Sequence, residues 1–234
     1  MLLEVKNLKV KRNDKEILRG IDLKIKEGET QVLLGPNGSG KSCFAQTILG
    51  NPKYKVTQGK ILFGRKDITR FAPEKRVKLG LALGWQNPPQ IKGVKFSELL
   101  EKISRGEFKI PDGENLLERE VNVDFSGGEK KISELLQILA LRPKLVIFDE
   151  IDSGLDLKRL ESVAKIIKKE LIQKGVSVLL ITHSGEILRF LKPRLTNVMV
   201  GGKIICKEKN YRKVLKVIKK YGYEKCKKCK LLAG

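Results

Sequence analysis

The residues best suited to chemistry lie in one glycine-rich stretch near the N-terminus. The stretch reads Gly35, Pro36, Asn37, Gly38, Ser39, Gly40, Lys41, Ser42 and Cys43. A glycine, four further residues, and then Gly-Lys-Ser make up the spacing of a phosphate-binding loop. Its glycines let successive backbone N–H groups turn toward phosphate oxygens. Lys41 can reach the β- and γ-phosphates and the Ser42 hydroxyl can coordinate Mg²⁺, so the stretch predicts a site for a nucleoside triphosphate.

The chain on either side of this loop has the pattern that such a loop needs. Residues 31–34 read as a strand and residues 42–49 as a helix. The N-terminus of that helix adds the positive end of its dipole to the anion site. An ordinary glycine-rich turn is the alternative interpretation, and the complete motif in this context favours the phosphate site.

A second motif combines a buried strand with two carboxylates. Residues 145–148 are all apolar and run directly into Asp149 and Glu150. At the carboxyl end of such a strand, Asp149 can hold Mg²⁺, and Glu150 can orient or deprotonate the water that attacks a γ-phosphate. Buried strands that end in Asp are common, so this motif takes its weight from the phosphate-binding loop.

A third motif begins a predicted helix. It reads Phe125, Ser126, Gly127, Gly128, Glu129, Lys130 and Lys131. Ser126 can cap the helix, Glu129 completes a capping box, and the two glycines between them admit the close approach of a ligand. A well-capped helix that binds nothing is the alternative interpretation of the same residues.

Two single residues follow predicted strands. Gln86 comes after a strand-like run at residues 79–85, and His183, the only histidine, follows one at residues 176–181. A lone histidine is more often structural than functional. His183 stands at the carboxyl end of a buried strand, where acids and phosphates would meet, so we expect it to be functional.

Together these motifs make the chain resemble the ATP-binding-cassette (ABC) ATPases. Residues 125–131 resemble the signature sequence of that family, and residues 153–156 resemble the loop that crosses its dimer interface. Gln86 matches the family's glutamine loop, and His183 matches its switch histidine near the γ-phosphate.

The resemblance implies ATP and Mg²⁺ as cofactors and assigns roles to individual residues. Catalytic roles fall on Lys41, Gln86, Glu150 and His183. The metal ion is expected at Ser42, Gln86 and Asp149. In the family two chains sandwich two ATP molecules, so we expect a transient ATP-dependent homodimer. In it, the phosphate-binding loop of one chain faces Ser126, Gly127 and Gly128 of the other.

Two segments resemble one branch of the family more closely. Residues 51–63 and 149–156 are similar to the SufC ATPases of the Suf iron–sulfur cluster assembly system. Transporter ATPases usually carry Pro-Thr-Ser or Pro-Thr-Ala where this chain has Ile-Asp-Ser at residues 151–153. The resemblance implies a cytoplasmic ATPase whose dimerisation reshapes a SufB- or SufD-type scaffold protein. An ATPase subunit of a membrane transporter and a nucleic-acid-associated ABC ATPase are the alternatives.

Cys43 departs from the family pattern, which mostly has threonine there. A thiol is a weaker hydrogen-bond donor than a hydroxyl, so we expect a weaker contact with the α-phosphate. Its place at a helix N-terminus beside Lys41 predicts a lowered thiol pKa. The hypothesis is an ATP site sensitive to oxidation, and a harmless substitution is the alternative.

These motifs need a particular set of elements to position them. The first 34 residues read as strands, whereas helices and strands alternate after Ser126. This order predicts an α/β fold with a mostly parallel core sheet and an N-terminal antiparallel β subdomain. Helices are predicted at residues 129–141, 157–173 and 211–221, and a hairpin at 198–205. We expect one ABC ATPase domain over residues 1–234, with a short inserted helical subdomain at about 88–125 and a basic helical tail at about 206–234.

Composition limits the class of protein. The chain has 234 residues of which 41% are apolar, enough for a packed core. No apolar run approaches the ~20 residues that span a bilayer. The first six residues alternate as a strand does and lack the apolar stretch of a signal peptide. We therefore expect a cytoplasmic protein without direct membrane insertion.

The net charge of +22 comes from 49 basic and 27 acidic residues, and it is concentrated in residues 203–230. A lysine-rich solvated surface and an anionic partner such as nucleic acid are the two explanations. Base-stacking surfaces usually interleave aromatic residues with basic ones, and this stretch has few, so the pattern disfavours nucleic acid. Cys226 and Cys229 could supply half of a tetrahedral zinc site or form an ordinary surface pair.

Overall fold

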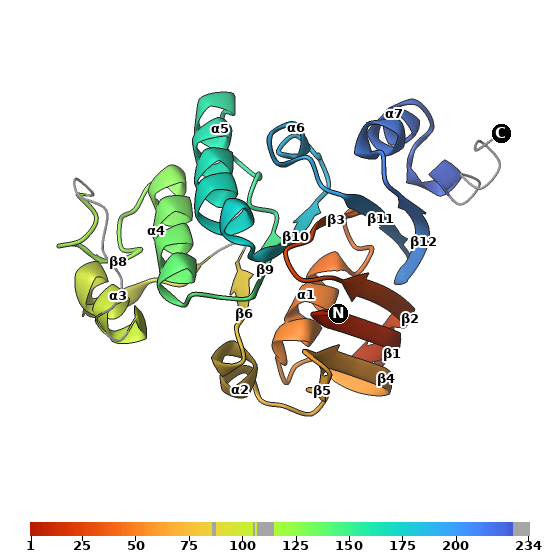
Figure 1. The fold of residues 1–234 in the computed structure, drawn as a ribbon, viewed down its shortest axis with the longest axis horizontal. Helices are drawn as coiled ribbons and strands as arrows, with labels where there is room; N and C mark the ends of the chain where they lie inside the picture. The colour runs from red at the N-terminus through yellow and green to blue at the C-terminus, as the bar shows by residue number, and fades with distance from the viewer. Residues whose placement is uncertain (86–87, 105, 107–114, 227–234) are drawn as a thin grey trace.

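A sheet of mainly parallel strands forms the centre of the computed structural model, which describes residues 1–85, 88–104, 106 and 115–226. Within these residues the strand order is β12-β11-β3-β10-β9-β6 (Figure 1). The strands are β3 (Thr30–Leu34), β6 (Leu81–Gly84), β9 (Leu145–Asp149), β10 (Ser177–Thr182), β11 (Leu195–Val200) and β12 (Lys203–Glu208). Neighbouring strands are parallel except β11 and β12, which form the predicted hairpin. The predicted α/β class with a mostly parallel sheet is confirmed.

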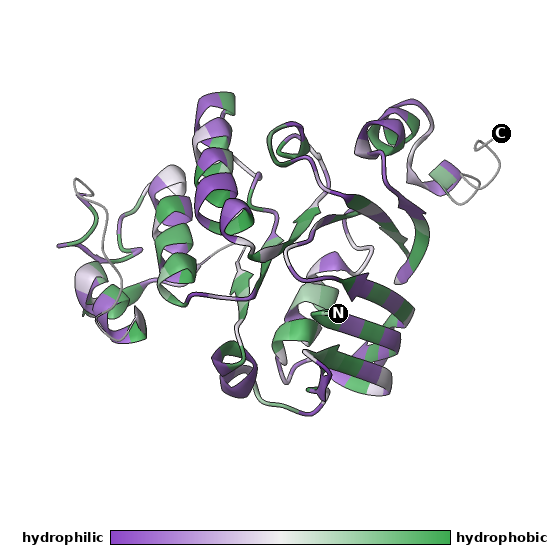
Figure 2. Ribbon diagram, viewed as in Figure 1, coloured by the Kyte–Doolittle hydropathy of each residue, from purple (hydrophilic) through white to green (hydrophobic). Residues whose placement is uncertain are grey.

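The middle strands are buried on both faces, as their apolar runs require. Every residue of β3, β9 and β10 is buried. Alternate side chains enter two different cores: Leu33 and Ile147 face one, whereas Val32 and Val146 face the other. Figure 2 shows the strongly apolar character of these strands. Because both faces are covered, polar groups can gather only at the strand ends.

A second, antiparallel sheet lies on one side of the molecule. Its order is β2-β1-β4-β5, with β1 (Leu3–Arg12), β2 (Lys15–Ile25), β4 (Lys55–Phe63) and β5 (Lys66–Asp67). Asn13 and Asp14 join β1 to β2 with φ of 47° and 59°. This left-handed conformation suits Asn and Asp better than most residues. The predicted N-terminal antiparallel sheet is confirmed.

Helix α1 (Lys41–Leu49) connects the two sheets (Figure 1). Its Phe44, Ala45 and Ile48 belong to a core that also contains residues of both sheets. The opposite face of the central sheet is covered by helices. They are α4 (Gly127–Ala140), α5 (Leu157–Ile166), α6 (Leu188–Leu191) and α7 (Tyr211–Tyr221). The start of α1 is thus held firmly at the carboxyl end of β3.

The segment at residues 88–125 contains strands as well as a helix. Strands β7 (Ile91–Lys95) and β8 (Glu120–Val121) pair antiparallel, and α3 (Phe96–Ser104) follows β7 directly. Phe96 and Leu100 of α3 pack against α4 in a small third core. The pairing of β7 with β8 joins residues that are distant in sequence, so no local periodicity indicates it. Residues 105 and 107–114 lie outside the described residues.

The helix predicted at residues 157–173 changes its hydrogen-bonding pattern along its length. After α5 it continues as a π-helical turn, η1 (Ile167–Leu171), and a 3-10 turn, η2 (Ile172–Lys174). Gly175 ends it with φ of 79°. Among the described residues, no helix combines the length and apolar character needed to cross a membrane.

Candidate functional site

The phosphate-binding loop joins β3 to α1, and two of its glycines are required by the chain's own packing. Gly40 caps α1 with φ of 105°, a conformation that favours glycine. A Cβ at Gly35 would collide with the Met199 carbonyl oxygen and the Ser39 hydroxyl. The backbone of Gly202 donates to the Ser39 carbonyl at 2.9 Å, which ties the loop to the β11–β12 hairpin.

Lys41, at the start of α1, lies buried beneath this loop. Its Nζ donates to the carbonyl oxygens of Gly35 at 2.8 Å and Pro36 at 3.1 Å. Burial lowers the pKa of Lys41, while the nearby carboxyls of Glu150 and Asp149 act in the opposite direction. The amine therefore lies among oxygen acceptors beside the N-terminus of α1, where it can also reach a phosphate.

Asp149 ends β9 and brings a carboxylate next to α1. Burial raises its pKa, and a hydrogen bond from the Ser42 side chain lowers it. Its Oδ1 is buried and has no hydrogen-bond partner among the described residues, and the same holds for the Ser39 hydroxyl. Buried oxygens without partners are costly, so both atoms are suited to a ligand that completes their bonding.

Glu150 and His183 meet at the ends of two adjacent strands. Glu150 follows β9 with φ of 56°, and its N–H donates to the Ile181 carbonyl at 2.8 Å. His183 follows β10, and its Nδ1 lies 3.2 Å from Glu150 Oε1. A non-glycine residue in this conformation stores backbone strain, which is concentrated at functional sites. The structure thus brings together Lys41, Ser42, Asp149, Glu150 and His183.

Asp152 is a site residue whose role sequence reasoning missed. Its Oδ2 accepts from the Thr182 hydroxyl at 2.7 Å and the Ser184 hydroxyl at 2.8 Å. Asp152 therefore ties the loop after β9 to the loop that carries His183. Ile151 is buried in the core beside it. The sequence shows an acidic residue at position 152, but it does not show that Thr182 and Ser184 donate to it.

The third motif caps α4 as predicted. The Ser126 hydroxyl accepts from the Glu129 N–H at 3.3 Å, and Glu129 accepts from the Ser126 N–H at 2.6 Å. A Cβ at Gly127 would meet no described atom within 4 Å. Gly127 also lacks the positive φ that favours glycine.

The single chain does not bring this motif to the phosphate-binding loop. A hollow of about 410 Å³ beside Ser126 and Gly128 is lined by described residues of α4 and α5, by Leu155, and by Asn115 and Leu116, and by none of residues 35–42. Ser126 and Gly128 thus line a hollow that does not include the phosphate-binding loop.

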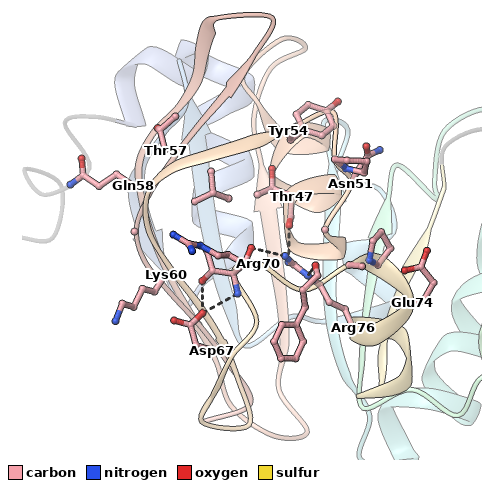
Figure 3. A pocket seen from close by; sticks show the side chains of 18 residues that line it. Thr47, Asn51, Tyr54, Thr57, Gln58, Lys60, Asp67, Arg70, Glu74 and Arg76 are labelled. Carbon is pink, nitrogen blue, oxygen red and sulfur yellow. Dashed lines mark hydrogen bonds between the residues drawn. The ribbon is translucent and has the colours of Figure 1, made fainter.

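A second hollow lies away from all of these residues. It measures about 860 Å³ and lies between β4, the end of α1 and α2 (Pro73–Lys78) (Figure 3). Arg76 is buried there and donates to the carbonyls of Thr47 at 3.0 Å and Ile48 at 2.8 Å, at the C-terminus of α1. Its guanidinium satisfies backbone groups of the helix end, which is a structural role.

The predicted reactivity of Cys43 is wrong. Its thiol is 7% exposed and lies 4.0 Å from the Thr47 hydroxyl. Burial raises its pKa to about 11, which outweighs the lowering by the Thr47 hydrogen bond and by the charge of Arg12. The prediction failed because the antiparallel sheet covers this turn of α1, and no local pattern shows that cover.

Two other residues singled out in the sequence, Gln86 and Cys229, lie outside the described residues. Cys226 is described and is buried in the core under α7. In the described part of the chain, no group of three or more His, Cys, Asp or Glu side chains could hold a metal ion.

The comparisons with known proteins agree with this geometry. A protein-family model described as ABC transporter matches residues 18–153. The chain belongs to the ABC transporter family. As a member of it, the chain is an ATP-hydrolysing enzyme. A probable ABC transporter ATP-binding protein of Streptococcus pyogenes serotype M3 is 40% identical over 224 residues, 87% of each chain. A probable ATP-dependent transporter of Antithamnion sp. is 40% identical over 227 residues, 88% of this chain and 90% of that one.

Solved ABC cassettes share the fold. The ADP conformation of an ATP-binding cassette from an ABC transporter has a TM-score of 0.77 at 25% identity and covers 96% of this chain and 97% of its own. The dimeric structure of a bacterial ABC transporter cassette has a TM-score of 0.74 at 21% identity, covering 89% of this chain and 98% of its own.

We predict that Cys43 is inert in the folded ABC ATPase. With a pKa of about 11, about one thiol in a thousand is ionised at pH 8. Mass spectrometry of peptides after alkylation at pH 8 should show little labelling of Cys43 in folded protein and full labelling in guanidinium. Labelling of Cys43 in the folded protein at the unfolded rate would contradict its burial.

Glu134 gives a pH-dependent prediction. Its carboxylate accepts the Trp85 N–H, and burial raises its pKa from 4.5 to about 7. As pH rises through this window, the unfolded chain ionises while the folded chain keeps the proton, so the unfolding free energy falls. Glu134→Gln should be more stable than wild type at pH 8 by on the order of 2 kcal/mol, with little gain at pH 4.

Urea unfolding of wild type and Glu134→Gln at both pH values measures this difference. The exposed Glu98 of α3 provides the control, since Glu98→Gln should follow the wild-type pH dependence. An equal pH dependence in Glu134→Gln and wild type would show that Glu134 does not titrate in this window.

Proposed function

We propose that this ABC ATPase is the ATP-hydrolysing subunit of a cytoplasmic iron–sulfur cluster assembly complex of the Suf type. The observation that carries this assignment is the arrangement of Ile151 and Asp152, where transporter ATPases usually have Pro-Thr. Ile151 is buried in the core, and Asp152 accepts two hydroxyl hydrogen bonds from the His183 loop. Of the two Suf-like residues, Ile151 thus packs in the core beside the site, and Asp152 makes hydrogen bonds within the site.

ATP would bind with its phosphates in the loop at residues 35–42. The backbone N–H groups of the loop and the N-terminus of α1 attract the anion, and Lys41 adds a positive charge. The Ser39 hydroxyl, buried without a partner, is suited to donate to a phosphate oxygen. The buried side chain of Cys43 faces Thr47 on the helix, which leaves its backbone N–H as its contact with the α-phosphate.

The residues present also fit Mg²⁺. Ser42 and Asp149 are joined by a side-chain hydrogen bond, and Asp149 keeps a buried oxygen that has no partner in the part of the chain that the structure describes. Hydroxyl and carboxylate oxygens are the ligands that Mg²⁺ prefers, and Gln86 would add an amide oxygen. When bound, the ion neutralises charge on the phosphate oxygens.

Hydrolysis would rest on Glu150 and His183. Glu150 is held by the hydrogen bond of its own N–H and by His183 Nδ1, so its carboxylate has a defined direction. A carboxylate in this position can orient or deprotonate the attacking water. His183 remains 43% exposed in the side chain, so it can also face the γ-phosphate.

A second copy of the chain would complete the site. Gly127 occupies an exposed position where its own chain imposes no steric need for glycine. Glycine there is explained by a group that approaches from outside the chain, and the γ-phosphate of ATP bound to a partner copy is such a group. The fold shared with a dimeric ABC cassette supports this proposal. ATP-driven closure would then reshape a SufB- or SufD-type scaffold.

The second candidate function is the ATPase subunit of a membrane transporter. It is favoured by the names of the relatives, which are called ABC transporter ATP-binding protein and ATP-dependent transporter. Both functions use the same ATP site, so the partner protein distinguishes them.

We expect Glu150→Gln to lose hydrolysis while it keeps ATP, because glutamine cannot act as a base. Affinity purification of this variant with ATP and Mg²⁺, followed by mass spectrometry, should recover a soluble SufB-like scaffold. The matched control is Glu150→Gln with Lys41→Ala, which should recover little of it. Recovery of an integral membrane protein instead would move the assignment to transport, and full hydrolysis by Glu150→Gln would overturn the role of Glu150.

A further inference from the structure

The loop that carries His183 has the C-terminal segment of the chain packed against it. Gly185, two residues after His183, lies so close to α7 that a Cβ there would be 2.8 Å from Leu215. Gly185 has φ of 71°. The backbone conformation favours glycine, and the missing side chain leaves room for Leu215. The backbone of this loop is therefore shaped to receive α7.

The side chain of Tyr223 in this segment contacts the backbone of the histidine. After α7 the chain turns at Gly222, with φ of 75°, and continues into a short helical turn that begins with Tyr223. The Tyr223 hydroxyl donates to the backbone carbonyl of His183 at 2.8 Å, across 40 residues of sequence. Cys226, at the end of the same turn, is buried in the core. The turn is thus anchored on both sides of its contact with the loop.

The state of Tyr223 suits this hydrogen bond. Its ring is half-buried and packs against the core between the central sheet and helices α4 to α7. Burial raises the pKa of Tyr223, and the neighbouring Cys226 adds to the effect. The hydroxyl therefore keeps its proton at neutral pH and serves as a donor to a carbonyl oxygen, which can only accept.

Two sets of hydrogen bonds hold the loop around His183. In one set Asp152 accepts from the hydroxyls of Thr182 and Ser184, the neighbours of His183. In the other Tyr223 holds the carbonyl of His183. The distance of 3.2 Å between His183 Nδ1 and Glu150 Oε1 is at the long end of the hydrogen-bond range. A rotation of this peptide would therefore move the imidazole out of hydrogen-bond range of Glu150.

We propose that Tyr223 is a positioning residue for His183, and that the C-terminal turn after α7 holds the imidazole in the direction that hydrolysis needs. The proposal rests on the role proposed for His183. It gives the C-terminal segment a part in catalysis that does not depend on its positive charge.

The test uses Tyr223→Phe in the full chain, since this change removes one hydroxyl and keeps the ring. The matched control is Tyr221→Phe, because Tyr221 is exposed and its ring faces Lys220 and Lys225. The chain has one histidine, so protein labelled with ¹³C-histidine gives a single imidazole signal that reports on His183 alone. ATPase kinetics are measured on the same samples.

We expect Tyr223→Phe to shift or broaden the imidazole signal and to lower kcat about threefold to tenfold, the effect of one lost hydrogen bond on a positioned group. The KM for ATP should stay within about twofold, because the phosphate-binding loop is untouched. Tyr221→Phe should change neither readout. A purely structural role would instead lower the thermal midpoint of Tyr223→Phe and leave the imidazole signal unchanged.

An unchanged imidazole signal in Tyr223→Phe would overturn the proposal, and so would a shifted signal with wild-type kcat. His183→Ala separates this failure from that of the proposed function. If His183→Ala hydrolyses ATP at the wild-type rate, the catalytic role of His183 is wrong, and the positioning proposal falls with it even where the signal shifts. If His183→Ala is inactive, the Tyr223→Phe readouts alone judge the proposal.

Discussion

The whole site depends on placing one amine and two carboxylates at the carboxyl ends of buried parallel strands. Lys41, Asp149 and Glu150 are each less than 10% exposed and lie close together. Burial alone would push Lys41 and Asp149 toward their neutral forms, and the opposite charge of each acts against this change in the pKa of the other. The central sheet provides this arrangement, because β3 and β9 flank β10 in parallel and their carboxyl ends coincide. The two cores that pack on the faces of the central sheet keep these strand ends in place.

Two kinds of constraint hold the group. Glycines that the packing requires, Gly35 and Gly40, let the loop wrap around Lys41. Side chains that cross between loops, Asp152 and Tyr223, fix the direction of His183. Removal of water and rigid orientation are what make such charges effective in catalysis.

The sequence predicted which residues come together at the strand ends better than it predicted the contacts that hold them. The loop at residues 35–42 and the acids after β9 were predictable because each motif is local and has a known spacing. The role of Asp152, the burial of Cys43 and the contact of Tyr223 were not, because each depends on a residue from a distant element. The β7–β8 ribbon was missed for the same reason, since short strands carry no periodicity of their own.

The central claim is that Ser126, Gly127 and Gly128 act on ATP held by another copy of the chain. It is tested by sedimentation of Glu150→Gln with Mg-ATP, with and without Gly127→Asp. Aspartate at a helix N-terminus is favourable within one chain, and the position is sterically open. Opposite a phosphate of a second chain it is repulsive. We predict an ATP-dependent dimer of Glu150→Gln and a double variant that still binds ATP but remains monomeric. A dimer that persists in the double variant would contradict it.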